Sequence, residues 1–293
     1  MLGSEIISAM VKVARTKSPE VSEVLKLSEV GGGCINRAHR VKTNGGVFFV
    51  KVNSESKYPG MFEAEARGLG LLSGSGEIAV PEVVGFGNAG GLSFLVLVFV
   101  ESHIKHSDFW EKFGRSLAGL HNKSANQFGL DHDNYIGSLK QTNSQEANWE
   151  EFFIMHRLLP QLRMARQEGL LPEKTEKQFG LLFRHLSDFF PREKPSLLHG
   201  DLWGGNYIVG ENGQAVVIDP AVYYGHRYMD LGMTKLFGGF PEYFYGYYNE
   251  RFPLEKGWQD SLEVANLYPL MVHVNLFGGG YLSSVNQILR RFA

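Results

Sequence analysis

The most informative part of the sequence is His199-Gly200-Asp201-Leu202-Trp203-Gly204-Gly205-Asn206, followed shortly by Val216-Val217-Ile218-Asp219-Pro220. Asp201 and Asn206 stand five positions apart. The residues between Asn206 and Asp219 form two β-prone segments around a glycine-containing turn, a pattern that predicts a β-hairpin. A hairpin returns Asp219 to the neighbourhood of Asn206. These two segments therefore predict one site that contains two carboxylates and one side-chain amide.

This set of groups suits phosphoryl transfer. Five positions is the interval between the catalytic base and the metal-binding amide in the catalytic loop of protein kinases. Because Mg²⁺ prefers oxygen ligands and leaves part of its coordination shell to water and phosphates, Asn206 and Asp219 are the expected metal ligands. Asp201 is then the expected acceptor of a substrate hydroxyl proton. His199 either supports the loop or is an ordinary hydrogen-bonded histidine, and both interpretations stay open.

Composition and charge disfavour several classes of partner. The chain has 293 residues, 43% of them apolar, with a formal charge of −2, which fits one large domain or two lobes. It lacks extended basic runs, so we expect neither a nucleic acid nor a membrane surface as partner. The longest strongly apolar run, residues 94–100, is far shorter than the roughly 20 residues that cross a bilayer. Since the N-terminus lacks the pattern of a secretory signal, a cytoplasmic location is expected.

The sequence contains one cysteine, Cys34. A single cysteine excludes an internal disulfide and fits a reducing compartment. A lone cysteine is usually a small buried apolar residue, but this one directly follows three glycines in an expected exposed loop. A redox role therefore stays open, and the chain is expected to be a monomer or a homodimer linked through Cys34.

The secondary-structure pattern divides the chain into a β-rich part and a helical part. Residues from about Leu25 to Val100 alternate β-prone segments with turns, apart from one helix expected to begin near Met61. From about residue 107, apolar residues recur at helical spacing. The sequence therefore predicts an α+β, bilobal fold. Its lobes are a small, mainly antiparallel β lobe at residues 1–101 and a larger α-helical lobe at residues 102–293.

The β-rich lobe supplies candidate groups for nucleotide binding. Gly31, Gly32 and Gly33 lie between two expected strands, where main-chain N–H groups can approach phosphate oxygens because no Cβ blocks them. An ordinary glycine-rich hairpin turn explains the same run, and the lysine of a P-loop does not follow it. Ligands commonly bind where two domains meet. We therefore expect the backbone of Val98 and Val100, in the crossover between the lobes, to bind adenine.

Lys51 is a more specific signal than the glycine run. It lies near the end of a β-prone strand, where an ammonium group can bridge phosphate oxygens while a helix carboxylate holds it in place. Glu65 is the expected carboxylate. Glu63 lies about 200° round the same helix, so only one of the two faces the site. An edge-strand lysine beside a solvated acidic helix face is the alternative.

Further motifs resemble a known family along nearly the whole chain. In chain order they are Gly32-Gly33-Cys34-Ile35-Asn36-Arg37-Ala38, Val50-Lys51-Val52-Asn53, Met61-Phe62-Glu63-Ala64-Glu65, Leu198 to Asn206, Asp219-Pro220-Ala221, Tyr224-Gly225-His226 and Phe237-Gly238-Gly239-Phe240. The chain resembles the fructosamine-3-kinases, or ketosamine-3-kinases. The tryptophan after His-Gly-Asp-Leu and the Gly-Gly-Cys-Ile-Asn segment distinguish this family from the related aminoglycoside and choline kinases.

The resemblance implies a protein-kinase-like fold, with ATP and Mg²⁺ as cofactors. The implied reaction is phosphorylation of the 3-hydroxyl of fructosamines or ribulosamines, which form when reducing sugars react with amines. A small ketosamine or a glycated lysine of a protein is the implied substrate. The family's product decomposes and releases the amine, so the activity reverses glycation. The family's phosphate-loop cysteine corresponds to Cys34, and it can link dimers and make activity redox-sensitive.

Three positions are candidates for substrate binding. Trp203 is expected to pack against the sugar or the lysine stem, with core packing as the alternative. The resemblance also points to His273 and Asn275, where relatives have His-Trp-Asn-His and this chain has His273-Val274-Asn275-Leu276. This departure leaves the preferred sugar open. A second departure, Leu97-Val98 in place of Met-Glu, should be tolerated if adenine is bound through the main chain.

Two other functions stay open. A kinase for an aminoglycoside, a choline-like alcohol or another small hydroxyl compound would share the fold and the Asp201 chemistry, and an acidic cleft for a polyamine would favour it. A nucleotide-binding pseudokinase usually lacks the lysine, the base or a metal position, whereas this chain has all of them. His226 and Asp230 are interpreted as structural supports of the catalytic loop.

Overall fold

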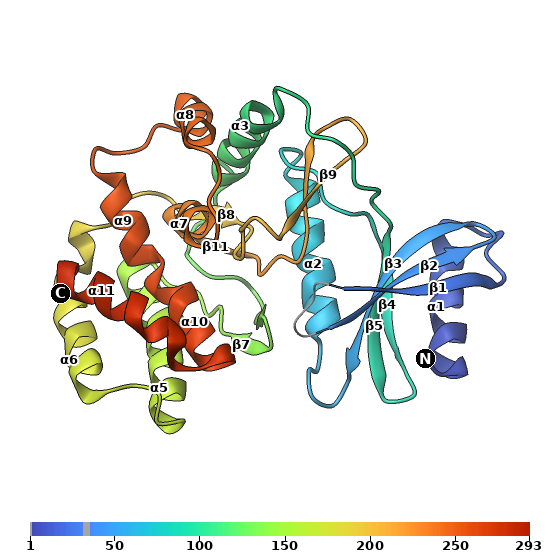
Figure 1. The fold of residues 1–293 in the computed structure, drawn as a ribbon, viewed down its shortest axis with the longest axis horizontal. Coiled ribbons are helices and arrows are strands. Elements are labelled where there is room, and N and C mark those ends of the chain that lie inside the picture. Colours follow the sequence, from blue (N-terminus) through green and yellow to red (C-terminus); the bar gives the residue numbers. More distant parts are fainter. Residues whose placement is uncertain (1, 32–35) are drawn as a thin grey trace. The chain divides into compact units, whose positions relative to one another are not determined.

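The computed structural model describes residues 2–31 and 36–293 (Figure 1). The chain forms two compact units, the first made of Met1–Phe109 with Ile208–Pro220 and the second of Trp110–Tyr207 with Ala221–Ala293. Residues 208–220 thus belong to the first unit although they lie far along the sequence. A division into lobes at residue 101 stays a prediction. The predicted α+β class is confirmed by a mainly antiparallel sheet and many helices.

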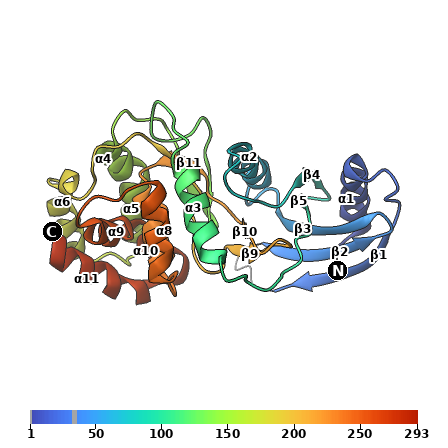
Figure 2. The ribbon, with the colours of Figure 1, turned by 90° about the horizontal axis from the view of Figure 1, so that it is seen from above.

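The first unit contains a five-stranded antiparallel sheet with the strand order β1-β2-β3-β5-β4 (Figures 1 and 2). In Figure 2, helices α1 and α2 lie on either side of β4 and β5. The bounds of these elements are α1 (Ser4–Lys17), β1 (Val24–Val30), β2 (Arg37–Thr43), β3 (Gly46–Ser54), α2 (Met61–Gly74), β4 (Val83–Ala89) and β5 (Leu92–Val98).

Strand β3 determines which way Lys51 points. Val50 and Val52 belong to the buried core that includes Ile6 and Met10 of α1. Side chains along a strand alternate between the two faces of a sheet. Lys51, between the two valines, therefore points to the face opposite α1, and Glu65 reaches it there from α2.

The predicted hairpin is present as β9 (Tyr207–Val209) and β10 (Ala215–Val217). Its turn is closed by a hydrogen bond from Gly210 N to Gln214 O of 2.8 Å. Two further backbone hydrogen bonds of 2.9 Å, from Val217 N to Ala79 O and from His103 N to Val209 O, attach the hairpin to the first unit. These bonds explain why a segment so late in the sequence belongs to that unit.

The second unit is mainly helical. Its helices are α3 (Phe109–His121), α4 (Trp149–Phe152), α5 (Leu159–Gln167), α6 (Glu173–Leu182), α7 (Tyr228–Leu236), α8 (Glu242–Arg251), α9 (Trp258–Ala265), α10 (Leu267–Phe277) and α11 (Leu282–Phe292), with a π-helical turn at Phe153–Leu158 and 3₁₀ turns at Leu186–Asp188 and Gly279–Tyr281. Its short strands are β6 (Asn134–Ile136), β7 (Leu139–Gln141), β8 (Ser196–Leu198) and β11 (Tyr223–Gly225).

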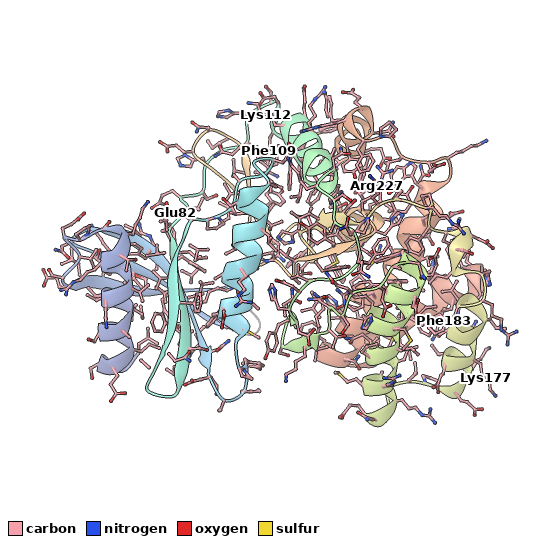
Figure 3. The ribbon with its side chains drawn as sticks, turned by 180° about the vertical axis from the view of Figure 1, so that it is seen from behind. Glu82, Phe109, Lys112, Lys177, Phe183 and Arg227 are labelled. Atoms are coloured by element: carbon pink, nitrogen blue, oxygen red, sulfur yellow. The ribbon has the colours of Figure 1, made fainter. Side chains whose placement is uncertain are left out.

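Strands β8 and β11 pair antiparallel, and the catalytic-loop sequence follows directly after β8. Figure 3 shows how side chains fill the second unit: Arg227 lies inside it, whereas Lys177 points outward. No helix in the described ranges is long and apolar enough to cross a membrane.

Candidate active site

The first unit brings Lys51, Glu65 and Asp219 together. Lys51 Nζ lies 2.7 and 2.9 Å from the two carboxylate oxygens of Glu65 and 3.0 Å from Asp219 Oδ1. Lys51 is 5% exposed. Glu63, on the same helix as Glu65, instead forms an exposed ion pair with Arg67 at 2.8 Å. One lysine thus links the helix carboxylate to the carboxylate that ends the β9–β10 hairpin.

The charge of Lys51 is stabilised by these neighbours. Burial alone lowers the pKa of Lys51, but the Glu65 and Asp219 carboxylates outweigh that effect and hold the pKa above its usual range. The side chain is therefore a cation at every physiological pH. A buried ammonium held in place by carboxylates is well suited to bind phosphate oxygens.

Asp219 has an uncommon backbone conformation, with φ at +55°. Within the described ranges it is the one non-glycine residue with positive φ. Such conformations cost free energy, persist where the surrounding structure enforces them, and cluster at functional sites. The side chain of Asp219 is 43% exposed. An accessible carboxylate with one oxygen directed to Lys51 fits a ligand for Mg²⁺, which binds carboxylate and water oxygens together.

The second unit holds Asp201 and Asn206 in one loop. Asn206 Nδ2 donates hydrogen bonds to Asp201 O at 2.8 Å and to Asp201 Oδ2 at 3.1 Å. The amide oxygen of Asn206 is therefore directed away from Asp201. This orientation fits the donor set of a magnesium site. Because Asn206 and Asp219 belong to different compact units, their joint binding of one metal ion stays a prediction.

Asp230 holds the backbone that leads into the catalytic loop. Its two carboxylate oxygens accept hydrogen bonds from His199 N at 2.7 Å and Gly200 N at 2.8 Å, and His121 Nε2 lies 3.2 Å away. Burial alone raises the pKa of Asp230, but the His121 contact and the backbone N–H groups lower it below its usual value. Asp201 N also donates to His199 Nδ1 at 3.2 Å. These contacts confirm Asp230 as a support of the loop, and they fit both interpretations of His199.

His121 is a residue that the sequence analysis missed. It ends α3, and its Nδ1 lies 2.8 Å from the hydroxyl of Tyr248 in α8. The ring thus connects α8 to the carboxylate of Asp230. Its position at the end of an apolar helix face was visible in the sequence, but no spacing relates it to a partner more than a hundred residues away.

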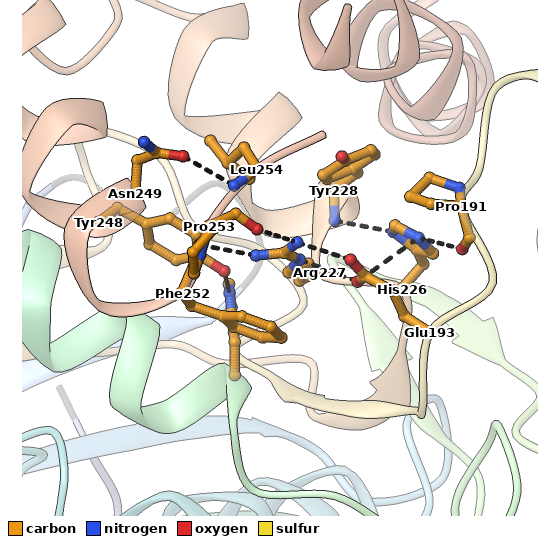
Figure 4. A network of polar contacts seen from close by, with 11 residues as sticks. Pro191, Glu193, His226, Arg227, Tyr228, Tyr248, Asn249, Phe252, Pro253 and Leu254 are labelled. Carbon is orange, nitrogen blue, oxygen red and sulfur yellow. Dashed lines mark hydrogen bonds and ion pairs between the residues drawn. The ribbon is translucent and has the colours of Figure 1, made fainter. Parts of the chain in front are cut away.

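The interpretation of His226 as a support of the catalytic loop is wrong. His226 Nε2 lies 3.2 Å from Pro191 O, and its Nδ1 accepts a hydrogen bond of 3.2 Å from Tyr228 N (Figure 4). The adjacent Arg227 is fully buried and bonds both oxygens of Glu193, at 2.6 and 2.8 Å. His226 therefore belongs to a network that ties the start of α7 to the loop around Pro191.

We expect His226 to make the protein less stable in acid. Burial is the main cause that lowers its pKa to about 3, whereas the unfolded value is about 6.5. Between these values the unfolded chain binds a proton that the folded chain does not, so stability falls as pH decreases. The expected slope is up to about 1.4 kcal/mol per pH unit.

This expectation is checked by urea unfolding at about pH 7.5 and about pH 5.5, in the wild type and in His226→Gln. The free energy of unfolding should depend less on pH in the variant, because glutamine does not titrate. Equal pH slopes in the two proteins would exclude His226 as the cause.

Glycine is required at position 200. Gly200 has φ at +85°, and a Cβ there would collide with the carbonyl oxygen of Ala221. Ala221 N in turn donates a hydrogen bond of 2.9 Å to His199 O. The catalytic loop thus lies directly against the segment that follows Asp219 and Pro220. Only a residue without a side chain permits this close approach.

Trp203 is 37% exposed, and its ring packs against Gly205 in the same loop. The loop therefore supports one part of the ring while another part stays accessible. This geometry leaves a surface of the ring for a ligand. Contact of Trp203 with a sugar or a lysine stem stays a prediction.

The two candidates on α10 point in different directions. His273 lies among aromatic rings, with centroids 4.5 Å from Phe237 and 5.0 Å from Tyr281. Asn275 Nδ2 donates to Gln161 O at 3.0 Å and to Gln161 Oε1 at 2.7 Å, which joins α10 to α5. Residues two apart on a helix lie about 200° from each other. The two side chains therefore do not share one face of α10, and a role in substrate binding stays a prediction for each.

The other candidates for nucleotide binding are the glycine run that begins at Gly31 and the crossover at Val98 and Val100. Gly31 follows β1, but Gly32, Gly33 and Cys34 lie outside the described residues. Val98 ends β5, and its N–H donates to Glu82 O at 2.9 Å. The Val98 N–H is therefore already hydrogen-bonded within the first unit. Binding of adenine by the main chain of Val98 and Val100 stays a prediction.

Nearly the whole sequence matches the model of one known protein family. Residues 6–293 match the model of the family described as Fructosamine kinase. The chain belongs to this family. The kinase family inferred from the motifs is thereby confirmed over almost the entire length.

Members of the family are similar in sequence and in structure. The chain is 38% identical over 289 residues to a probable ketoamine kinase of Synechocystis sp., with 95% of each covered. It is 38% identical over 277 residues to the chloroplastic protein-ribulosamine 3-kinase of Arabidopsis thaliana, covering 92% of this chain and 83% of that protein. A structure described as a fructosamine-3-kinase from Thermobifida fusca has a TM-score of 0.84 and 34% identity, with 95% and 96% covered.

An aminoglycoside phosphotransferase is similar in fold alone. Its TM-score is 0.61 at 16% identity, and the match covers 97% of this chain and 99% of that one. The predicted kinase-like fold is thereby confirmed.

Proposed function

We propose that this enzyme transfers the γ-phosphoryl group of ATP to the 3-hydroxyl of a ketosamine, a ribulosamine or fructosamine. The observation that carries the proposal is the cluster of Lys51, Glu65 and Asp219 at 2.7 to 3.0 Å. It occurs in a chain that also keeps Asp201 and Asn206 at the kinase spacing. The names of the relatives, ketoamine kinase and protein-ribulosamine 3-kinase, support the choice of acceptor.

Asp201 is the proposed general base. In this role it orients the substrate hydroxyl and accepts its proton as the oxygen attacks phosphorus. Asn206 and Asp230 keep the loop in shape, the first through the carbonyl and carboxylate of Asp201 and the second through the preceding N–H groups. Positioning of the reacting groups accounts for much of the rate enhancement in phosphoryl transfer.

The nucleotide half of the proposed site uses the positive charge of Lys51. Lys51 binds phosphate oxygens, and Glu65 holds it from α2. Asp219 and Asn206 are the proposed ligands of Mg²⁺, because their oxygens are the type that this ion prefers. When bound, Mg-ATP supplies the phosphoryl group and neutralises part of the charge that develops during transfer. Gly31, Gly32 and Gly33, with Val98 and Val100, remain proposed nucleotide contacts.

The proposed substrates are small ketosamines or the glycated lysine side chains of proteins, which assigns the enzyme to deglycation. Trp203 is the proposed contact for the apolar edge of the sugar or the lysine stem, and His273 and Asn275 are further candidates. We also propose a cytoplasmic location, where the thiol of Cys34 stays reduced. A homodimer linked through Cys34 under oxidising conditions remains a separate proposal.

One assay separates the candidate substrates. The protein is incubated with Mg-ATP and, in turn, with ribuloselysine, fructoselysine, choline and kanamycin, and ADP release is measured. We expect turnover with at least one ketosamine and phosphorylation at its 3-hydroxyl, which ³¹P NMR identifies. ADP release with kanamycin or choline but with neither ketosamine would overturn the proposal in favour of another small-molecule kinase.

A further inference from the structure

A buried group of amides holds the chain just after the proposed metal ligand. Gln141 Nε2 donates to Ala221 O at 3.2 Å, and Asn134 Nδ2 donates to Val222 O at 2.8 Å. The two carbonyls are consecutive. Both amides belong to the β6–β7 hairpin, in which Asn134 and Gln141 are direct partners. Gln141 Nε2 also donates to Asn134 Oδ1 at 2.8 Å, so the two side chains act together.

The Asn134–Gln141 pair is held from two sides. The hydroxyl of Tyr268, in α10, donates to Gln141 Oε1 at 2.6 Å. Asn143 Nδ2 donates to Asn134 Oδ1 at 3.1 Å, and Arg157 Nη2 donates to Asn143 Oδ1 at 2.7 Å. Each of these five side chains belongs to a residue that is at most 6% exposed. A buried amide in a connected network has its orientation set by its neighbours, because each alternative leaves a polar group unsatisfied.

Arg157 is the last residue in the series of hydrogen bonds that runs from Ala221 through Gln141, Asn134 and Asn143. It is 0% exposed, in the π-helical turn between α4 and α5, and its Nη1 donates to Thr142 O at 2.7 Å. Its guanidinium carbon lies 3.9 Å from the ring centre of Tyr223. Insertions of π-helix are uncommon and frequently occur at functional sites. Here the turn places a buried cation where it fixes Asn143.

The carbonyl that Gln141 holds lies against the catalytic loop. Ala221 donates its N–H to His199 O, and its carbonyl occupies the space beside Gly200 that a Cβ would need. Burial raises the pKa of Tyr268, and the Asp201 carboxylate acts in the same direction, so Tyr268 lies within electrostatic reach of the proposed base. Asp219 precedes Ala221 by two peptide bonds. The network thus contacts Ala221, which follows the metal candidate Asp219 in the chain and hydrogen-bonds His199 at the start of the catalytic loop.

We propose that Gln141 and Asn134 are positioning residues for phosphoryl transfer. Their amides fix the carbonyls of Ala221 and Val222, and through Ala221 they fix the backbone of His199 and Gly200 that carries Asp201. Tyr268 sets the orientation of Gln141. This inference deepens the proposed function and rests on it, because it assigns these residues to the geometry of the same reaction.

A pair of matched tyrosine variants tests the inference. Tyr268→Phe removes the hydroxyl that orients Gln141, whereas Tyr245→Phe removes a buried hydroxyl that lies 2.8 Å from Thr234 Oγ1 in the same unit. Both variants should lose similar stability. We expect kcat to fall about 3- to 10-fold in Tyr268→Phe with KM for ATP nearly unchanged, and to stay within about 2-fold of wild type in Tyr245→Phe. Equal kcat values for the two variants would overturn the proposal.

We expect Gln141→Leu to lower kcat more than Tyr268→Phe does. It removes the donor to Ala221 O, and we expect kcat to fall about 10- to 100-fold, since small displacements of reacting groups are costly. Hydrogen exchange gives a readout independent of activity: the N–H groups of His199 and Ala221 should exchange at least about 10-fold faster than in wild type. If Gln141→Leu does not fold, the exchange is measured in Tyr268→Phe. Unchanged exchange at both positions would overturn the inference.

This design separates the two proposals. If the wild-type protein phosphorylates no ketosamine, the proposed function fails, while the exchange experiment still tests whether Gln141 holds the loop. If the wild type is active and the exchange rates of the variants do not change, the inference alone fails.

Discussion

Asp201→Asn is expected to lower kcat for the ketosamine by about 10²–10⁴-fold, the usual loss when a general base is removed. Asparagine keeps the size of the side chain but lacks a basic oxygen. Because Asp201 interacts with Asn206 within the loop and Lys51 belongs to the other compact unit, nucleotide binding should persist. The measurement is ADP release with ribuloselysine, accompanied by the thermal shift that Mg-ATP produces.

The thermal shift is the control for this variant. A shift equal to that of the wild type shows that the fold and the nucleotide site are intact, so the lost turnover belongs to the chemical step. Turnover close to the wild-type value in a folded Asp201→Asn protein would contradict the assignment of the base. Loss of both turnover and the Mg-ATP shift would instead indicate damage to the loop.

Lys51→Met is expected to reduce both activity and stability. It removes the cation that we assign to the nucleotide phosphates, and loss of one such electrostatic contact costs about 10²–10³-fold in rate. It also leaves the carboxylate of Glu65, whose side chain is 10% exposed, without its partner. Breaking a buried ion pair by removing one member costs about 3–5 kcal/mol. Urea unfolding and steady-state kinetics measure the two losses separately.

Two further variants separate the cause of the lost stability from the cause of the lost activity. Lys51→Met with Glu65→Gln replaces the uncompensated charge by a neutral amide, so stability should recover in part while activity does not. Arg67→Met breaks the exposed pair with Glu63 on the same helix, and we expect it to cost less than about 1 kcal/mol and to leave kcat unchanged. Equal costs for Lys51→Met and Arg67→Met would show that the buried pair does not stabilise the fold.

The stability that Lys51 provides should not depend on pH near neutrality. The pKa of Lys51 is higher in the folded protein than its usual value. A group of this kind contributes its full stability below the unfolded pKa, about 10.4, and loses it only as pH rises through the folded value. In Lys51→Met the buried Glu65 carboxyl can take up a proton, because burial raises its pKa and the opposing lysine is gone. The measurement therefore compares the wild type with the double variant Lys51→Met with Glu65→Gln, and the difference in unfolding free energy should be the same at about pH 7 and about pH 9.

Sequence reasoning succeeded where the relevant contacts follow from local periodicity. Alternation along β3 places Lys51 on the sheet face opposite Val50 and Val52. The helical repeat of α2 decides that Glu65, rather than Glu63, faces Lys51. The β9–β10 hairpin was readable from its β-prone segments and its turn. The order and spacing of these motifs also identified the family.

Reasoning of the same kind failed where a residue's partner lies far away in the sequence. His226 was expected at the catalytic loop and instead bonds Pro191 O, and its neighbour Arg227 pairs with Glu193. Asn275 Nδ2 bonds Gln161 in α5, a partner that the sequence did not indicate, and a role of Asn275 in substrate binding stays a prediction. No period or spacing indicates such partners, because the choice depends on which buried polar groups the fold leaves to be satisfied.

Residue order alone thus established the family, the α+β class and the candidate groups for phosphoryl transfer, since each depends on short-range patterns or on motif order. Only the tertiary structure shows which residues hold those groups in place. Asp230 meets the backbone of His199 and Gly200, and Gln141 meets Ala221, across 30 to 80 residues of sequence. Buried donors and acceptors must find partners wherever the packed chain brings them. The hydrogen bonds that hold the catalytic loop therefore could not be predicted from the sequence and were seen only in the tertiary structure.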